Sequence, residues 1–211
     1  MIWIIQLTGC THASTEGATI GHSQAEKVAS HERVLRIAAR KVRVDGVSGP
    51  NIAELMNEAG LTHGGFYKHF GSRDDLITQA ATVALAEGSP KMEKAARMNK
   101  QEPRAGLIDA YLGKQHRDSP ATGCALVTLG AAAGRSDAQF KDAYSQQVRA
   151  YLDLLTGLAD NPDPEETRSE AMLTLSAMVG AVLMARAVAE PELSDELLTS
   201  VAAQLKRHVE H

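Results

Sequence analysis

The chain has 211 residues, 44 % of them hydrophobic but only 4 % aromatic, and its formal net charge at pH 7 is −4. This length allows one large helical body, or a small domain joined to a larger one. Two cysteines are too few for a disulfide framework or a zinc cluster, and the eight histidines lack metal-ligand spacing, so we expect no metal site and no cofactor. The composition thus excludes disulfide-rich and zinc-finger proteins.

Residues 1–23 are expected to form a flexible arm. The arm opens with the apolar run Met-Ile-Trp-Ile-Ile and continues with many Ser, Thr and Gly residues. The apolar run is too short for a signal-peptide core and no basic residue precedes it, so we expect neither a signal peptide nor a membrane anchor. An arm that enters a DNA minor groove is the alternative, although no Arg or Lys comes before Lys27.

Apolar residues at helical spacing predict a first helix from Lys27 to Val44. Its inward face holds Val34, Ile37, Ala38 and Val42. Its outward face is expected to hold Arg33, Arg36, Arg40, Lys41 and Arg43. Residues 27–73 contain eight Lys and Arg against four Asp and Glu, whereas residues 74–211 carry a net charge of −6. A basic helix face is usually plain solvated surface, but an overlap with a DNA-binding motif favours a nucleic-acid partner.

Such a motif follows, because two short helices are predicted on either side of a glycine. Asn51 is placed to cap the first helix, residues 51–59, and Glu54 to reach back to it in a capping box. Gly60 can adopt the left-handed conformation that ends a helix and redirects the chain. This pattern is typical of a helix-turn-helix.

The second helix of the motif is predicted at residues 63–70, with Thr62 as its cap. Phe66 and Phe70 lie four residues apart and are expected to face the core, which leaves mostly polar and glycine residues outside. Short or polar side chains near the start of a helix suit an approach to base edges in a major groove. The alternative is a surface helix of an ordinary helical protein.

The segment Gly60-Leu-Thr-His-Gly-Gly-Phe-Tyr-Lys-His-Phe-Gly-Ser-Arg-Asp-Asp-Leu76 resembles the signature of TetR/AcrR-family transcriptional regulators. The resemblance covers about fifty residues, from Ser30 to Gln79. It implies an all-α fold in which a three-helix DNA-binding domain, residues 24–73, joins a larger helical ligand-binding and dimerisation domain, residues 74–211. It also implies that the residues nearest the base edges are Thr62, His63, Gly64 and Gly65. The residues that it places along the phosphate backbone are Asn51, Tyr67, Lys68, His69 and Arg73.

The rest of the chain shows helical periodicity without β-rich runs. The fourth helix is expected from the Ser72 cap to about Glu87, and Gly88-Ser89-Pro90 is expected to break the chain. Further helices are predicted at residues 90–100, 104–114, 121–133, 137–159, 164–189 and 194–209. The last two are amphipathic and carry small residues on one side, which fits either internal core packing or a second chain. The family resemblance implies a four-helix dimer interface, so we expect a homodimer.

Residues that could bind a ligand are scattered over these helices. The candidates for the lining of a pocket are Tyr111, Cys124, Tyr144, Tyr151, Met172 and Met178. Met and Tyr at helical spacing are more often plain core or interface residues. Cys124 precedes an apolar helix, and a thiol at a helix N-terminus can be reactive, so either an inert buried cysteine or an electrophile sensor fits.

No catalytic constellation or phosphate-binding loop stands out, so we expect no enzyme. The predicted function is a cytoplasmic transcriptional regulator, most simply a repressor that a small-molecule inducer releases from a palindromic double-stranded DNA operator. The alternatives are a helical ligand-binding or thiol-based electrophile-sensing protein without repressor activity, and an activator with the same fold.

Overall fold

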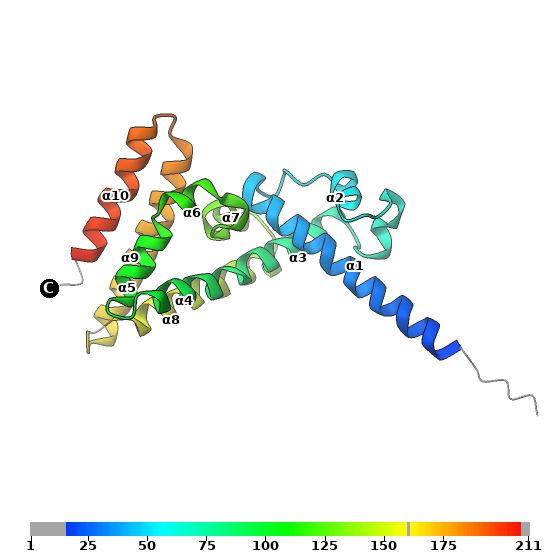
Figure 1. Cartoon of the computed structure of the whole chain (residues 1–211), viewed down its shortest axis with the longest axis horizontal. Coiled ribbons are helices and arrows are strands. Elements are labelled where there is room, and N and C mark those ends of the chain that lie inside the picture. The colour runs from blue at the N-terminus through cyan, green and yellow to red at the C-terminus, as the bar shows by residue number, and fades with distance from the viewer. Residues whose placement is uncertain (1–15, 160, 208–211) are drawn as a thin grey trace, which may run out of the picture.

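The computed structural model describes residues 16–159 and 161–207, and within them every regular element is a helix, which confirms the predicted all-α fold (Figure 1). The α-helices of the first half are α1 (Glu16–Asp45), α2 (Ile52–Glu58), α3 (Arg73–Ala86), α4 (Gly88–Met98), α5 (Pro103–Tyr111) and α6 (Lys114–Asp118). Those of the second half are α7 (Ala125–Ala133), α8 (Ala138–Gly157), α9 (Pro164–Ala187) and α10 (Pro191–Arg207). Two short 3₁₀ helices, η1 (His63–Lys68) and η2 (Pro120–Thr122), complete the chain.

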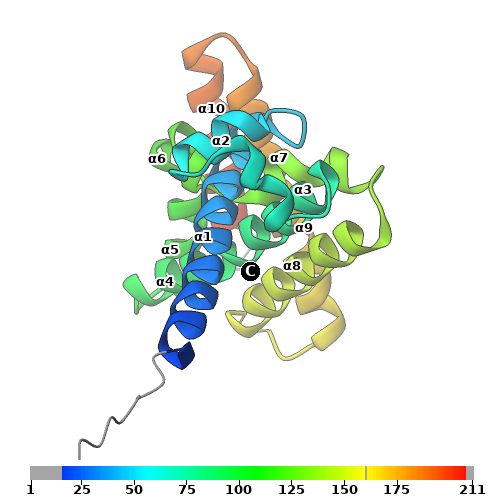
Figure 2. The ribbon, with the colours of Figure 1, turned by 90° about the vertical axis from the view of Figure 1, so that its right-hand side faces the viewer.

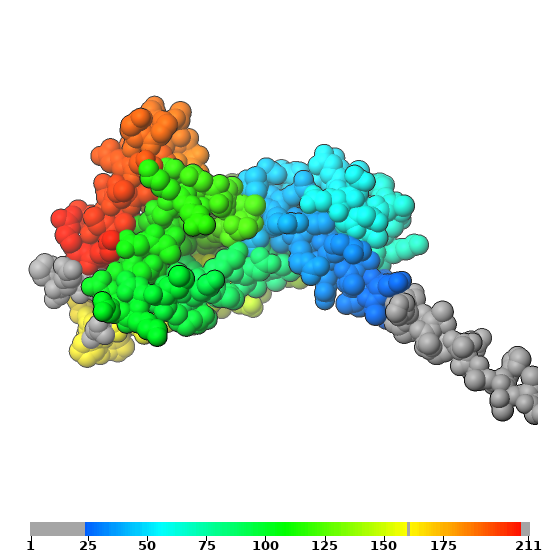
Figure 3. Space-filling view, viewed as in Figure 1, coloured from blue at the N-terminus to red at the C-terminus, as the bar shows by residue number. Residues whose placement is uncertain are grey.

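The N-terminal unit consists of α1, α2, η1 and α3 around a shared apolar core. Val34, Leu55, Phe66 and Leu76 come from four different segments and are each at most 1 % exposed. Phe66 and Phe70 stack with ring centroids 5.6 Å apart, as their spacing predicts. The unit lies at one end of an elongated molecule, and α9 and α10 lie at the other (Figures 1 and 3).

Two features of the N-terminal unit differ from the prediction, the start of the first helix and the type of the third. Helix α1 begins at Glu16 rather than Lys27, so residues 16–23 of the expected arm are helical, while residues 1–15 lie outside the described residues. The second helix of the motif is a 3₁₀ helix, not an α-helix. The pair Gly64-Gly65 explains this difference, because glycine lowers α-helical propensity and the segment is only six residues long.

The break expected at Gly88-Ser89-Pro90 falls one residue earlier, at Glu87. Helix α3 ends at Ala86 and α4 starts at Gly88, with Glu87 between them in a helical conformation. Pro90 falls in the first turn of α4, where no backbone N–H is needed for the helix. A Cβ on Gly88 would lie 1.9 Å from the Tyr151 hydroxyl, so the glycine permits the close approach of α8.

Arg43 is the largest departure from the predicted helix faces. Its side chain was expected outside but is 2 % exposed. The guanidinium donates to the Ala84 carbonyl (2.9 Å) and the Glu87 carboxylate (2.6 Å) through Nη2, and to the Ala121 carbonyl (3.3 Å) through Nη1. Arg43 therefore ties the end of α1 to the junction of α3 and α4 and to η2.

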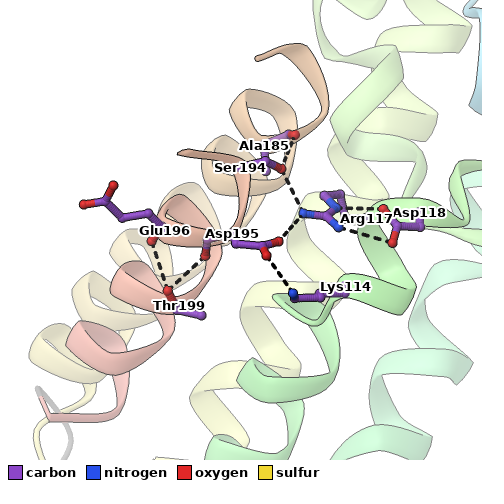
Figure 4. A network of polar contacts seen from close by, with 8 residues as sticks. All are labelled: Lys114, Arg117, Asp118, Ala185, Ser194, Asp195, Glu196 and Thr199. Carbon is purple, nitrogen blue, oxygen red and sulfur yellow. Dashed lines mark hydrogen bonds and ion pairs between the residues drawn. The ribbon is translucent and has the colours of Figure 1, made fainter. Parts of the chain in front are cut away.

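The C-terminal body is formed by α4 to α10, with α8 packed beside α3 and α9 (Figure 2). The segment between the predicted helices at residues 104–114 and 121–133 is mostly helical, because α6 occupies it. Arg117 of α6 donates to Asp195 (2.6 Å) and Ser194 (3.0 Å) at the start of α10, and Lys114 donates to the other Asp195 oxygen (2.6 Å; Figure 4). Ser194 in turn donates to the Ala185 carbonyl of α9 (2.6 Å), so α6 is held against both last helices.

Candidate DNA-binding surface and ligand cavity

The turn of the helix-turn-helix forms as its sequence predicts. The Asn51 side chain accepts hydrogen bonds from the backbone N–H groups of Ala53 (2.9 Å) and Glu54 (3.4 Å), and so caps α2. Glu54 does not complete a capping box, since its carboxylate lies 4.0 Å from the Lys41 ammonium. Gly60 has φ = +71°, the left-handed conformation that redirects the chain toward η1.

The polar residues of η1 lie on the outer surface. Thr62, His63, Gly64 and Lys68 are exposed, and Tyr67 is 74 % exposed. The Thr62 side chain makes no capping hydrogen bond, contrary to its predicted role as a cap, so its hydroxyl is free for an external partner. Because neighbouring Phe66 is buried, the helix is anchored from inside and presents its opposite side outward.

A depression between η1 and the N-terminal half of α1 extends this surface. It is lined by Glu26, Lys27, Ser30, Tyr67, Lys68 and His69. Partial burial lowers the pKa of His69, and the positive charges of His31, Lys27 and Lys68 lower it further. His69 is therefore a hydrogen-bonding group more than a cation near neutral pH. Lys27 and Ser30 belong to this surface, although no motif in the sequence identifies them.

Arg73 uses one end of its guanidinium within the chain, although its side chain is 41 % exposed. Its Nη2 donates to the carbonyls of Val47 (2.9 Å), Ser48 (3.3 Å) and Pro50 (3.5 Å). These carbonyls have no helical partners because they lie in the loop between α1 and α2, and a guanidinium can satisfy several acceptors at once. Arg73 thus holds the loop that leads into the motif, a role that the sequence does not predict, and its contact with a phosphate stays a prediction.

A cavity of about 190 Å³ lies in the body between α4, α5, α8 and the segment that leads into α7. Three of the six predicted ligand residues, Tyr111, Cys124 and Tyr151, line it together. The other three do not. Tyr144 donates to the Leu126 carbonyl (3.3 Å) between α7 and α8, Met178 is a fully buried core residue, and Met172 is 45 % exposed on the surface of α9.

The polar groups of the cavity are held in fixed roles. His116, which sequence reasoning missed, bonds the Tyr111 carbonyl through Nδ1 (2.6 Å) and accepts from the Cys124 N–H at Nε2 (2.9 Å). Both ring nitrogens are thus used by a neutral imidazole, and burial lowers the pKa of His116. Burial also raises the pKa of both Tyr111 and Tyr151, and the adjacent Cys124 adds to each shift.

Two further features distinguish the inner and outer parts of the cavity. The Cys124 Sγ lies 3.6 Å from the Tyr151 hydroxyl, whereas the buried Tyr111 hydroxyl has no hydrogen-bond partner among the described residues. At the rim, the Lys91 ammonium donates to the Thr122 carbonyl (2.7 Å), and desolvation lowers the pKa of Lys91. Among residues 16–159 and 161–207, no cluster of His, Cys, Asp and Glu could hold a metal ion.

The outer face of α9 is apolar and uncovered within this chain. Large hydrophobic side chains that are 45–55 % exposed follow one another along it: Met172, Leu173, Leu183 and Met184. A Cβ on Gly180, midway along α9, would meet no atom within 4 Å. Length and composition alone would let α9 cross a membrane, yet 39 % of its most apolar stretch is buried against other helices. What remains exposed forms a helix face that a second helix could approach closely.

No family model matches the chain. It is 26 % identical to the uncharacterised HTH-type transcriptional regulator Rv0196 of Mycobacterium tuberculosis over 167 residues, which span 74 % of this chain and 83 % of that protein. It is also 25 % identical to the uncharacterised HTH-type transcriptional regulator YerO of Bacillus subtilis over 87 residues, 41 % of this chain and 30 % of that protein.

Solved structures resemble the whole fold. The reduced form of NemR from E. coli gives a TM-score of 0.68 at 18 % identity, over 85 % of this chain and 97 % of that chain. A TetR transcriptional regulator from Chloroflexus aurantiacus gives a TM-score of 0.71 at 19 % identity, over 86 % of this chain and 96 % of that chain. The chain therefore has the fold of the TetR-family transcriptional regulators, as the motif at residues 60–76 predicts.

Proposed function

We propose that the chain is a DNA-binding transcriptional repressor that acts as a homodimer on a palindromic operator and is released by a small-molecule inducer. The observation that carries the proposal is the outer surface of η1, where polar side chains and glycines are exposed while Phe66 anchors the helix from inside. The relatives are named as transcriptional regulators, which supports the same class of function and not that of an enzyme. Such a regulator works in the cytoplasm.

The proposed DNA contacts follow from exposure. Thr62 and His63 with the two following glycines lie at the exposed start of η1 and would face base edges. Tyr67, Lys68 and the partly buried His69 lie along its other end, where phosphates would pass. Asn51 can contribute only its amide N–H groups, because its oxygen caps α2.

The proposed dimer forms through α9 and α10 of two chains. A groove lined by Leu173, Ala177, Val201 and Leu205 runs between the two helices and continues the apolar face of α9. A two-fold axis through this face would set two copies of η1 against two half-sites of one operator, so protein symmetry requires a palindrome.

The structure offers a direct route from the cavity to the DNA-binding unit. Lys91 and Thr122 line the cavity, and each lies beside a partner of Arg43, namely Glu87 and Ala121. A ligand that displaces the cavity wall would therefore strain the contacts that hold the end of α1. Release of DNA requires that the ligand bind the altered geometry more tightly than the DNA-bound one.

The DNA proposal is tested by selecting fragments of the source genome with the purified protein and then measuring affinity for the selected operator at several salt concentrations. Lys68→Ala should weaken binding to all sequences and lower the salt slope by about one, because one phosphate contact is lost. Lys141→Ala removes an exposed lysine of α8 instead and should leave the slope unchanged. Absence of any selected sequence would refute the regulator.

The dimer proposal is tested by substitutions that introduce charged side chains on the apolar face of α9. Leu173→Glu combined with Leu183→Glu should convert a dimer to a monomer in sedimentation equilibrium and abolish operator binding. Met98→Glu changes a 78 % exposed residue of α4 and should leave the dimer intact. A double variant that stays dimeric would exclude this interface.

The placement of Cys124 favours a second candidate function, a thiol-based electrophile sensor. Its thiol lies in the cavity beside the Tyr151 hydroxyl, where a reactive ligand could reach it. Cys124→Ser should then abolish the response of DNA binding to a thiol-reactive inducer such as N-ethylmaleimide, and an unchanged response would exclude the sensor.

A further inference from the structure

We infer that the cavity binds a small, mainly apolar molecule of about one ring that carries a carbonyl or carboxylate oxygen and no positive charge. This inference rests on the proposed function in that such a molecule would be the inducer. Its support lies in the volume of the cavity, in the kinds of side chain on its walls, and in one buried hydroxyl without a partner.

The walls fix the size and the apolar character of the ligand. Met92 and Leu107 are buried side chains on facing helices, and Ala95 and Ala110 line the same space nearer the surface. An apolar cavity of about 150 Å³ is sufficient for benzene, and drug-sized ligands need about 300 Å³ or more. The cavity of about 190 Å³ therefore fits a single ring with a short substituent.

The polar groups that remain available can each donate a hydrogen bond, and the Lys91 ammonium cannot accept one. The Tyr111 side chain is buried, and its hydroxyl makes no hydrogen bond of regular geometry among the described residues. The neighbouring Cys124 thiol, a weak hydrogen-bonding group that also acts on Tyr111, contacts the Tyr151 hydroxyl (3.6 Å). The Lys91 ammonium has three donors, of which the Thr122 carbonyl uses one. Both nitrogens of His116 are occupied.

The same walls contain no acid. None of the residues that line the cavity is Asp or Glu, so a cationic ligand would find no counter-charge and would lie near the Lys91 ammonium. A buried hydroxyl without a partner disfavours the empty protein, and a ligand oxygen that accepts from Tyr111 removes that cost. The chemistry of the cavity therefore selects an acceptor oxygen and rejects an amine.

The experiment compares four probes of equal ring size with the full-length protein in the absence of DNA, by isothermal titration calorimetry. Ethylbenzene and acetophenone differ in a carbonyl oxygen, and benzoate and benzylamine carry opposite charges. Acetophenone should bind about fivefold more tightly than ethylbenzene, as one neutral hydrogen bond provides. Benzoate should bind and benzylamine should not.

Variants assign these preferences to residues. Tyr111→Phe removes one buried hydroxyl and should abolish the preference for acetophenone over ethylbenzene. Tyr144→Phe is the matched control, because it removes a tyrosine hydroxyl that bonds the Leu126 carbonyl outside the cavity, and it should keep the preference. Lys91→Gln should weaken benzoate binding and leave acetophenone binding unchanged.

Several results would overturn the inference. These are binding of none of the probes, binding of benzylamine as tight as that of acetophenone, or a preference for acetophenone that persists in Tyr111→Phe. Because no DNA is present, the test is independent of operator binding. If the protein shows these ligand preferences but selects no operator, the inference about the ligand stands and the proposal of a repressor fails.

Discussion

The N-terminal unit and the C-terminal body bury different kinds of side chain. Among the described residues of α1 to α3, Arg43 and Thr78 are the only buried polar or charged ones. The body, in contrast, buries several polar side chains: Arg104, Gln147, Thr167, Thr174 and Ser194. The first unit keeps most of its polar groups outside, where the proposed DNA contacts lie, whereas the body buries polar side chains that hydrogen-bond between its helices, as Arg104 does with Thr174. Both units have apolar cores, and the body should in addition depend on internal hydrogen bonds and a buried ion pair.

The largest effect on stability is expected at Phe66 of η1, whose neighbour Tyr67 is exposed. Phe66 is 1 % exposed and Tyr67 is 74 % exposed. Phe66→Ala should lower the free energy of unfolding by about 3–5 kcal/mol, because it leaves a cavity in the shared core. Tyr67→Ala should change stability by less than about 0.5 kcal/mol but weaken operator binding. Urea unfolding and gel shifts measure the two effects, and equal stability losses would break the proposed division between core and surface.

The second prediction concerns the buried ion pair of the body. Arg104 is 7 % exposed and donates to Glu170 (3.2 Å) and to the Thr174 hydroxyl (3.1 Å). Glu170→Ala leaves the guanidinium buried without its counter-charge, so it should lower the free energy of unfolding by about 3 kcal/mol. The combined variant Arg104→Met with Glu170→Leu should recover most of that loss, because a hydrophobic pair has no charge to desolvate.

The exposed pair Arg97 and Glu93 is the matched control for the buried one. Its N···O distance is also 3.2 Å, but its side chains are 68 % and 48 % exposed. Glu93→Ala should therefore change stability by less than about 0.5 kcal/mol. A loss as large as that of Glu170→Ala would mean that burial does not determine the strength of these pairs.

A smaller effect is expected at the caps of the helix-turn-helix. Asn51→Ala should lower the free energy of unfolding by about 1 kcal/mol, because two N–H groups of α2 lose their acceptor. Thr62→Ala should have little effect on stability, since its hydroxyl caps no helix, and should instead weaken operator binding. Unfolding curves that rank the two residues in the opposite order would contradict this assignment.

Features that depend on neighbouring residues in the chain can be predicted from the sequence, and most of them lie in the N-terminal unit. The helix-turn-helix, the cap at Asn51 and the positive φ of Gly60 depend on contacts between near neighbours, so local pattern identifies them. The 3₁₀ form of η1 was missed because the motif was read as α-helical despite two glycines. The start of α4 at Gly88 is not predicted, because a proline suits both a break in the chain and the first turn of a helix.

Long-range contacts account for most of the site that the sequence does not predict. Arg43 lies on a helix whose basic residues are mostly exposed, and only its acceptors on α3, η2 and Glu87 place it inside. Tyr111, Cys124 and Tyr151 come together because α5, α7 and α8 meet at one cavity, while Met172 has the same residue type as buried Met178 but faces outward. Helical periodicity records which face is apolar but not which partner covers it.

The last prediction is a pH dependence of stability that arises from His116 in the cavity wall. Burial lowers the pKa of His116 in the folded chain below its ordinary value of 6.5, so the unfolded chain binds more protons as the pH falls. Stability from this group is fully present well above pH 6.5 and is lost as the pH falls from 6.5 through the lower folded-state pKa, by at most about 1.4 kcal/mol per pH unit. Urea unfolding between pH 7.5 and 5 should show that the free energy of unfolding declines less steeply in His116→Gln than in wild type.

The control for this measurement is His69. Its pKa is also lowered, but His69 is present in both proteins, so the difference between them reports His116 alone. Parallel declines would mean that protonation of the His116 imidazole, between Tyr111 and Cys124, does not destabilise the folded chain. That result would contradict the neutral, doubly hydrogen-bonded His116 in the cavity wall.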